Sequence, residues 1–170
     1  MKYNKIATSF AFIIVLSASL YSKDYELPEN YVSLSESSLK QFEPEILKCI
    51  DYLENAPQDD VSDRKKRINS FFMEWITLSP SVSIKIQPYL IDLCKVNTNL
   101  LLVFMCGWTK YSINNSYSND QLKCNMAGLE SLMNSYQKCK GIIRDDKVDI
   151  LVKLKKDNKL ESWIKEQIKE

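Results

Sequence analysis

The sequence contains no histidine in its 170 residues. This absence removes the commonest general base of enzymes, the commonest metal ligand, and every catalytic triad built on an imidazole. Zinc sites that combine cysteine with histidine are excluded for the same reason. The chain also has no G-x-S-x-G motif, no P-loop and no dinucleotide-binding fingerprint. We therefore assign no catalytic residue, no metal ligand and no cofactor from the sequence.

Glycine is scarce as well, with only Gly107, Gly128 and Gly141 in the chain. Gly107 and Gly128 fall inside predicted helices, where glycine is costly unless a neighbouring element comes close. We therefore expect both to permit close helix packing rather than the approach of a ligand. Gly141 stands where a glycine that ends a helix belongs.

The first 22 residues have the pattern of a secretory signal peptide. Lys2 and Lys5 precede an apolar stretch from residue 6 to residue 16, and small residues follow. The apolar stretch is short for a membrane helix, although an uncleaved anchor is the alternative reading. We expect cleavage after Ser19 or Ser22 and export to the periplasm or the extracellular space.

Neither sign of charge dominates the sequence. The whole chain has a formal net charge of +1, and removal of residues 1–22 takes away two lysines and no acid, which gives −1. A nearly neutral protein has no overall field that would attract nucleic acid or anionic lipid. We expect no nucleic-acid partner, no membrane span in the mature chain, and another exported or envelope protein as partner.

Five cysteines remain after residue 22, and no two of them form a C-x-x-C motif. Disulfides become possible in an oxidising compartment, but an odd number leaves at least one thiol unpaired within the chain. Cys94 and Cys106 flank a predicted turn and are the pair most able to form a bond. The alternative is that all five are buried thiols that act as small apolar side chains.

The longest apolar run after the N-terminal segment is residues 100–108, with the sequence LLLVFMCGW. Every face of a helix made from this run would be apolar, which is typical of an element surrounded by others. Asn97, Thr98 and Asn99 before the run are good N-cap residues. We predict a central helix from Asn99 to about Asn114.

Apolar residues at spacings of three and four predict further helices on both sides of this one. Residues 23–42 are expected to form an extended lead-in with one short helical turn, and residues 43–170 a single all-helical domain. Pro44 is tolerated in the first turn of a helix and should begin the first one. The predicted helices span about 44–55, 64–78, 88–96, 99–114, 120–140, 145–156 and 158–168.

These predictions give an all-α fold of about seven helices, arranged as an antiparallel bundle or as a short stack of helical hairpins. A tetratricopeptide-like stack would need small residues where paired helices touch. Only Ala56 and Ala127 follow residue 22, which argues against such a stack. In its layout the chain resembles small exported helical bacterial proteins of unknown function, and this resemblance implies no activity.

Four groups of polar residues could carry a function. The aspartates at 59, 60 and 63, and those at 145, 146 and 149, lie at expected helix starts, where acids favour the helix dipole and need no ligand. The basic run 64–67 should form a solvated helix face. The turn-rich segment 111–121 is a candidate binding loop, with Tyr111, Asn114, Asn115 and Tyr117 as its contact residues, or else a plain polar connector.

We therefore expect an exported helical protein that binds another protein or supports an envelope assembly without catalysing a reaction. Two alternatives stay open. A carboxylate-based hydrolase would need two acids facing one cleft. A thiol redox protein would need a partly exposed cysteine with a lowered pKa.

Overall fold

The computed structural model describes residues 25–29, 31 and 33–168, and within them it is all-helical, with seven helices and no strand. The prediction of an all-α fold with about seven helices is confirmed. The predicted signal peptide, residues 1–22, lies outside the described residues. The helices are α1 (Leu39–Leu53), α2 (Asp63–Leu78), α3 (Pro88–Leu93), α4 (Asn99–Asn114), α5 (Gln121–Lys138), α6 (Asp146–Lys156) and α7 (Leu160–Gln167).

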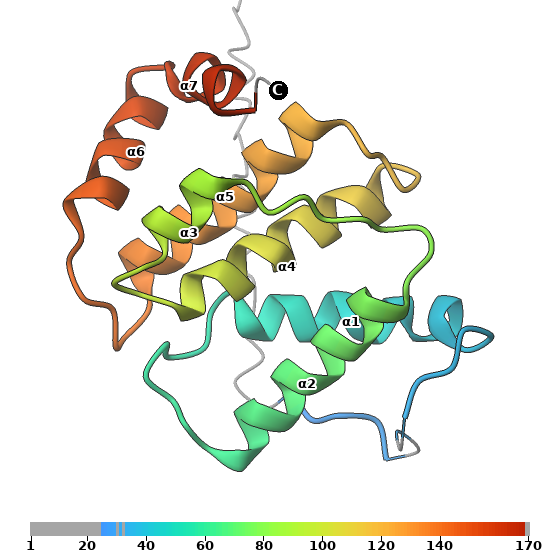
Figure 1. Cartoon of the computed structure of the whole chain (residues 1–170). Coiled ribbons are helices and arrows are strands. Elements are labelled where there is room, and N and C mark those ends of the chain that lie inside the picture. The colour runs from blue at the N-terminus through green and yellow to red at the C-terminus, as the bar shows by residue number, and fades with distance from the viewer. Residues whose placement is uncertain (1–24, 30, 32, 169–170) are drawn as a thin grey trace, which may run out of the picture.

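The helices pack around a hairpin formed by α4 and α5, which share the most extensive helix contact of the fold (Figure 1). On one side α1 packs against α4, and α2 packs against α1. On the other side α6 and α7 pack against α5 and against each other. The predicted central helix Asn99–Asn114 is confirmed in its bounds, but it shares the centre of the molecule with α5.

Two glycines let α4 and α5 approach so closely. A β-carbon at Gly128 would meet the Phe104 ring at 2.6 Å, and one at Gly107 would meet the Ala127 carbonyl oxygen, also at 2.6 Å. Both distances are shorter than any normal contact, so only glycine fits at either position. The expectation that these two glycines serve packing is confirmed.

Large aromatic side chains fill the core on the α1–α2 side of this hairpin. The rings of Phe71, Phe72 and Trp75 on α2 are fully buried. The indole Nε1 of Trp75 donates a hydrogen bond to the Leu39 carbonyl oxygen at 2.9 Å, which satisfies the one polar atom of that ring. The bond also ties α2 to the first residue of α1.

Helix α1 begins at Leu39, five residues before the predicted start at Pro44. Pro44 lies inside the helix instead of opening it. Burial explains the difference, because Leu39 is only 4% exposed and the Phe42 ring packs edge-on against Phe71 at 5.9 Å. The predicted lead-in is also part of the core, since Tyr25 is buried.

Side-chain caps begin three of the helices. Ser62, Asp120 and Asp145 accept hydrogen bonds from the backbone N–H groups of Lys65, Lys123 and Lys147. The distances are 3.2, 3.1 and 2.9 Å in that order. Capping satisfies backbone donors that a helix start would otherwise leave unpaired.

Three further predicted helix boundaries were wrong. Helix α5 ends at Lys138, so Gly141 is not its cap; Gly141 has a φ of +75° and leaves no room for a side chain beside Asp59. Asn158 does not open α7 but closes α6, with a φ of +56°. Helix α3 is also shorter than predicted and ends at Leu93 instead of near Val96.

Candidate functional site

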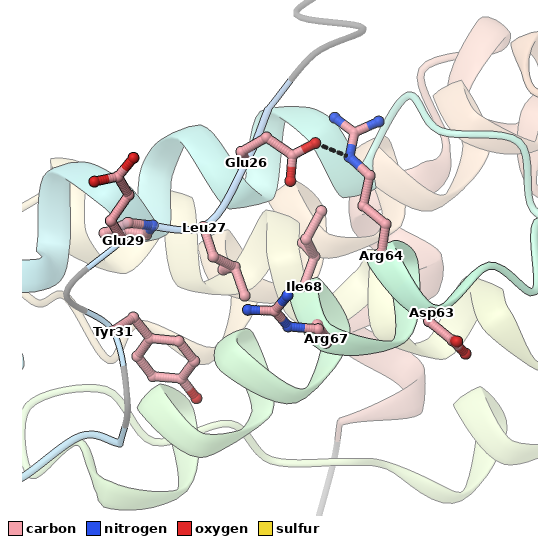
Figure 2. A pocket seen from close by; sticks show the side chains of 9 residues that line it. Glu26, Leu27, Glu29, Tyr31, Asp63, Arg64, Arg67 and Ile68 are labelled. Atoms are coloured by element: carbon pink, nitrogen blue, oxygen red, sulfur yellow. Dashed lines mark ion pairs between the residues drawn. The ribbon is translucent and has the colours of Figure 1, made fainter.

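An extended N-terminal segment, residues 25–31 without residue 30, lies beside the first turns of α2, and the two line a hollow of about 470 Å³ (Figure 2). Arg64 holds the two elements together. Its Nη2 atom donates to the Tyr25 carbonyl oxygen at 2.6 Å, and its Nε atom pairs with Glu26 at 2.8 Å. The guanidinium also lies over the Tyr52 ring, 5.2 Å from the centroid.

Three acids line this hollow, but they do not converge on one point. Glu26 is paired with Arg64, and Asp63 pairs with Lys66 at 3.1 Å. Figure 2 shows Glu29 at the opposite end of the segment from Glu26, with Leu27 between them, and Asp63 on α2 pointing away from both. This geometry lacks the facing carboxylates that acid–base hydrolysis needs.

A second hydrogen-bonded link, at the Tyr31 end of the hollow, fixes the N-terminal part of the chain to α2. The Tyr31 hydroxyl hydrogen-bonds to one oxygen of Glu74, and the Leu34 N–H donates to the other at 2.8 Å. Burial, together with this hydrogen bond, raises the pKa of Tyr31 to about 12. Tyr31 therefore stays protonated near neutral pH and acts as a fixed hydrogen-bond donor.

The basic run 64–67 is not the solvated helix face that the sequence predicted. Lys65 is only 4% exposed, and its ammonium group donates to the Pro57 carbonyl oxygen. Arg64 is engaged by the N-terminal segment, so only Lys66 and Arg67 face solvent. The prediction failed because the α1–α2 loop folds back over the first turn of α2.

The structure places the four residues of the predicted binding loop at the end of α4 and in the turn that follows. Tyr111 is half-buried inside α4, and Asn114 is its exposed last residue. Asn115 is exposed, and its side-chain amide donates to the Tyr111 carbonyl oxygen at 2.8 Å. The Tyr117 hydroxyl donates to Glu43 on α1 at 2.7 Å, which anchors the turn to the bundle.

This turn contains two consecutive non-glycine residues in the left-handed region, with φ values of 56° at Ser116 and 58° at Tyr117. Such a conformation persists only where the surroundings hold it in place. The hydrogen bond from Tyr117 to Glu43 fixes this conformation. The turn is therefore rigid, and it exposes Asn114, Asn115 and Ser116. Its role in binding stays a prediction.

The aspartates at 145, 146 and 149 all lie at the start of α6, as predicted, whereas only Asp63 of the first cluster lies in the first turn of α2. Asp145 caps α6, Asp146 and Asp149 lie in its first turn, and Asp63 lies in the first turn of α2. Asp60 accepts a hydrogen bond from the Ser62 N–H at 2.8 Å, and this bond lowers the pKa of its carboxyl group. Within the described part of the chain no group of three or more acids and cysteines is arranged to hold a metal ion.

All five cysteines are free thiols in the structure. Cys94 follows the short helix α3, Cys106 lies in the middle of α4, and both are buried free thiols. Burial raises the pKa of Cys94 to about 12 and that of Cys124 to about 11. Cys139 alone is partly exposed.

Sequence reasoning missed a groove of about 320 Å³ between α3, α6 and α7. Tyr89 and Leu93 from α3 face Ile150 and Leu151 from α6, and Trp163 from α7 closes the groove. The Tyr89 and Trp163 rings pack edge to face at 5.2 Å. The sequence contained one indication of this groove, because Ile150 is an apolar residue that lies outside the apolar stripe of α6.

Ile150, which lines this groove, is 57% exposed. Three further exposed apolar residues lie on α3 or on the segments that follow α3 and precede α6: Ile91 (58%), Val96 (46%) and Ile143 (62%). They belong to elements that are tied together. Lys147 pairs with Asp92 across α6 and α3, and the Asn97 amide exchanges two hydrogen bonds with the Ile143 backbone at 2.7 and 2.8 Å.

No protein-family model, curated protein or solved structure matches this chain in sequence or fold. Among the described residues, no helix is both long enough and apolar enough to cross a bilayer.

Proposed function

We propose that this chain is an exported helical protein that binds another exported or envelope protein through the groove between α3, α6 and α7. The observation that carries the proposal is the set of four exposed apolar side chains on the elements that form or adjoin the groove. Exposed apolar patches on soluble proteins commonly mark interaction sites. Aromatic residues such as Tyr89 and Trp163 are typical anchors of protein interfaces.

Charge and chemistry favour a protein as the occupant of this groove. With residues 1–22 removed the formal net charge is −1, which attracts neither nucleic acid nor anionic lipid. The polar groups Asp92 and Lys147 at the groove pair with each other, so they leave mainly apolar surface to be covered. A partner with a row of apolar side chains fits this surface best.

A photo-crosslinking experiment in the native cell tests the proposal. A benzophenone amino acid at Ile150 should give one discrete crosslinked product that contains a different protein. The same group at Met73, an exposed apolar residue of α2 away from the groove, should give none. Ile150→Asp should abolish binding of the purified partner, whereas Met73→Asp should leave it intact.

Three results would contradict the proposal: equal crosslinking from both positions, no crosslink at Ile150, or a product made only of two copies of this chain. Export is tested separately by cell fractionation and N-terminal sequencing. The exported product should begin near Lys23, and an intact chain recovered from the cytoplasm would refute export.

A further inference from the structure

A hollow of about 670 Å³ lies on a different face from the groove, where the end of α1 and the α1–α2 loop meet the end of α5. Its volume is in the range of small-ligand pockets. The buried side chains of Tyr52 and Ala56 form part of its wall, together with the ring of Pro57. The hollow therefore offers an apolar surface to a ligand.

The charged residues of this hollow are mostly cationic. Arg64, Lys138 and Lys140 line it, against Asp60 as the one acid. Asp60 is already engaged by the Ser62 N–H. Lys138 and Lys140 are exposed, and neither forms an ion pair with a described residue.

Lys65 adds a buried positive charge behind the same wall. It is 4% exposed, and its ammonium group donates to the carbonyl oxygen of Pro57, which lines the hollow. No carboxylate among the described residues forms an ion pair with it. Burial is the largest cause that lowers the pKa of Lys65, and the carboxylates of Asp60 and Asp59 act in the opposite direction. Lys65 therefore adds a positive charge behind the wall, and these two acids offset it in part.

We propose that this hollow binds a carboxylate carried on an apolar group, with the carboxylate at Lys138 and Lys140 and the apolar group against Tyr52 and Ala56. Lysine and arginine form charge-assisted hydrogen bonds to carboxylates. Two sources share this chemistry, a small carboxylic acid and the carboxyl terminus of a peptide that ends in an apolar residue. This site is separate from the groove between α3, α6 and α7, and the proposal does not depend on the function proposed for that groove.

Cys139 provides a probe of the occupied hollow, because it lines the wall and is the one partly exposed thiol. The purified protein is treated with iodoacetamide under native conditions, and alkylation of Cys139 is followed by mass spectrometry. The ligands are 4-phenylbutyrate and an acetylated tripeptide that ends in leucine, with a free or an amidated carboxyl group. A ligand bound in a pocket buries most of its surface against the protein, so it should cover Cys139 and slow alkylation in proportion to the occupied fraction of the hollow.

The proposal expects at least one free acid to slow alkylation and the amide to have no effect. Protection by phenylbutyrate alone would identify a small acid as the occupant, and protection by the peptide acid would identify a peptide terminus. The double variant Lys138→Gln/Lys140→Gln should remove the protection. The matched double variant Lys153→Gln/Lys156→Gln, which changes two exposed lysines of α6, should keep it.

Isothermal titration calorimetry with the same ligands checks binding without the thiol. The ratio of alkylation rates with and without ligand is compared within each variant, because loss of nearby lysines also changes the rate of the unliganded thiol. Equal protection by acid and amide, equal loss of protection in both double variants, or no binding of either acid would overturn the proposal.

Discussion

The aromatic ring of Phe104 in α4 lies directly over Gly128 in α5, so that a β-carbon on the glycine would stand 2.6 Å from the ring's Cε2 atom. The Phe104 carbonyl oxygen would be 2.9 Å from the same carbon. This contact sets the spacing of the α4–α5 hairpin, around which the other helices pack.

Gly128→Ala should therefore destabilise the fold, although alanine is the better helix former. The ring could turn aside, but the backbone oxygen could not, so the two helices must separate. Overpacking of this kind costs about 1–3 kcal/mol, which outweighs or offsets a helix-propensity gain of about 1 kcal/mol. A free energy of unfolding from urea denaturation that rises in this variant would contradict the close contact.

Phe104→Ala tests the same contact from the other side. The ring is fully buried and packs 5.9 Å from the Trp108 ring. Its removal should lower the free energy of unfolding by about 3–5 kcal/mol. Ile91→Ala, at a position that is 58% exposed, is the control and should change little. A denaturation midpoint unchanged by the loss of Phe104 would place the core elsewhere.

Local signals in the sequence predicted the helices well. The bounds of α4 follow from its uniform apolar run and the polar residues before it, and both features act within a few residues. Pairing of α4 with α5 could not be predicted, because the contact of Phe104 with Gly128 joins residues that no local pattern connects. The same limit applies to the groove, which needs three separate helices to be in place.

The buried charges were the least predictable feature of the candidate sites. Lys65 stands in a run of four basic residues, a pattern that usually faces water. Its burial depends on the loop that carries Pro57 to its ammonium group. The candidate binding loop could be recognised from its composition, but the anchor from Tyr117 to Glu43 on α1 could not.

Asn158 provides a test of the α6 end. The Lys159 N–H donates to the Leu154 carbonyl oxygen at 2.8 Å, and the Asn158 N–H donates to that of Lys155 at 3.1 Å. This is the Schellman pattern, which places Asn158 in the left-handed region. Asn158→Ala should cost about 1–2 kcal/mol, because a β-carbon without a polar group is disfavoured there.

Asn158→Gly is the matched control, since glycine adopts the left-handed region freely. It should keep the stability of the original protein or raise it in thermal unfolding. If alanine is tolerated as well as glycine, the turn between α6 and α7 is not held in this conformation.

The Asp120 cap predicts a pH dependence of stability. The hydrogen bond from the Lys123 N–H is the main cause that lowers the pKa of this carboxyl group from its ordinary value of 3.8. A folded-state pKa below the unfolded one means that the stabilisation is complete above pH 3.8 and is lost as the pH falls through the folded-state value.

Asp120→Ala should therefore lower the free energy of unfolding by about 1 kcal/mol near neutral pH, and by progressively less in acid. Asp120→Asn keeps a capping side chain that does not titrate, so it should retain most of the stability at neutral pH. Urea denaturation of the three proteins between pH 7 and pH 2.5 measures both effects. A constant difference between Asp120→Ala and the original protein would show that the cap is not ionised.

The thiols give the last prediction. Cys49, Cys106 and Cys124 have no exposed surface, Cys94 is 4% exposed, and Cys139 alone is partly exposed. Alkylation requires an accessible sulfur atom and its thiolate form. In the four buried cysteines, burial covers the sulfur and raises the pKa of the thiol, so neither requirement is met. Iodoacetamide should thus label Cys139 in the native protein and all five cysteines after unfolding in guanidinium.

Mass spectrometry of unreduced peptides from the exported protein checks the labels and any disulfides together. A linked peptide pair containing Cys94 and Cys106 would contradict the structure, in which both are buried free thiols and Cys106 lies inside α4.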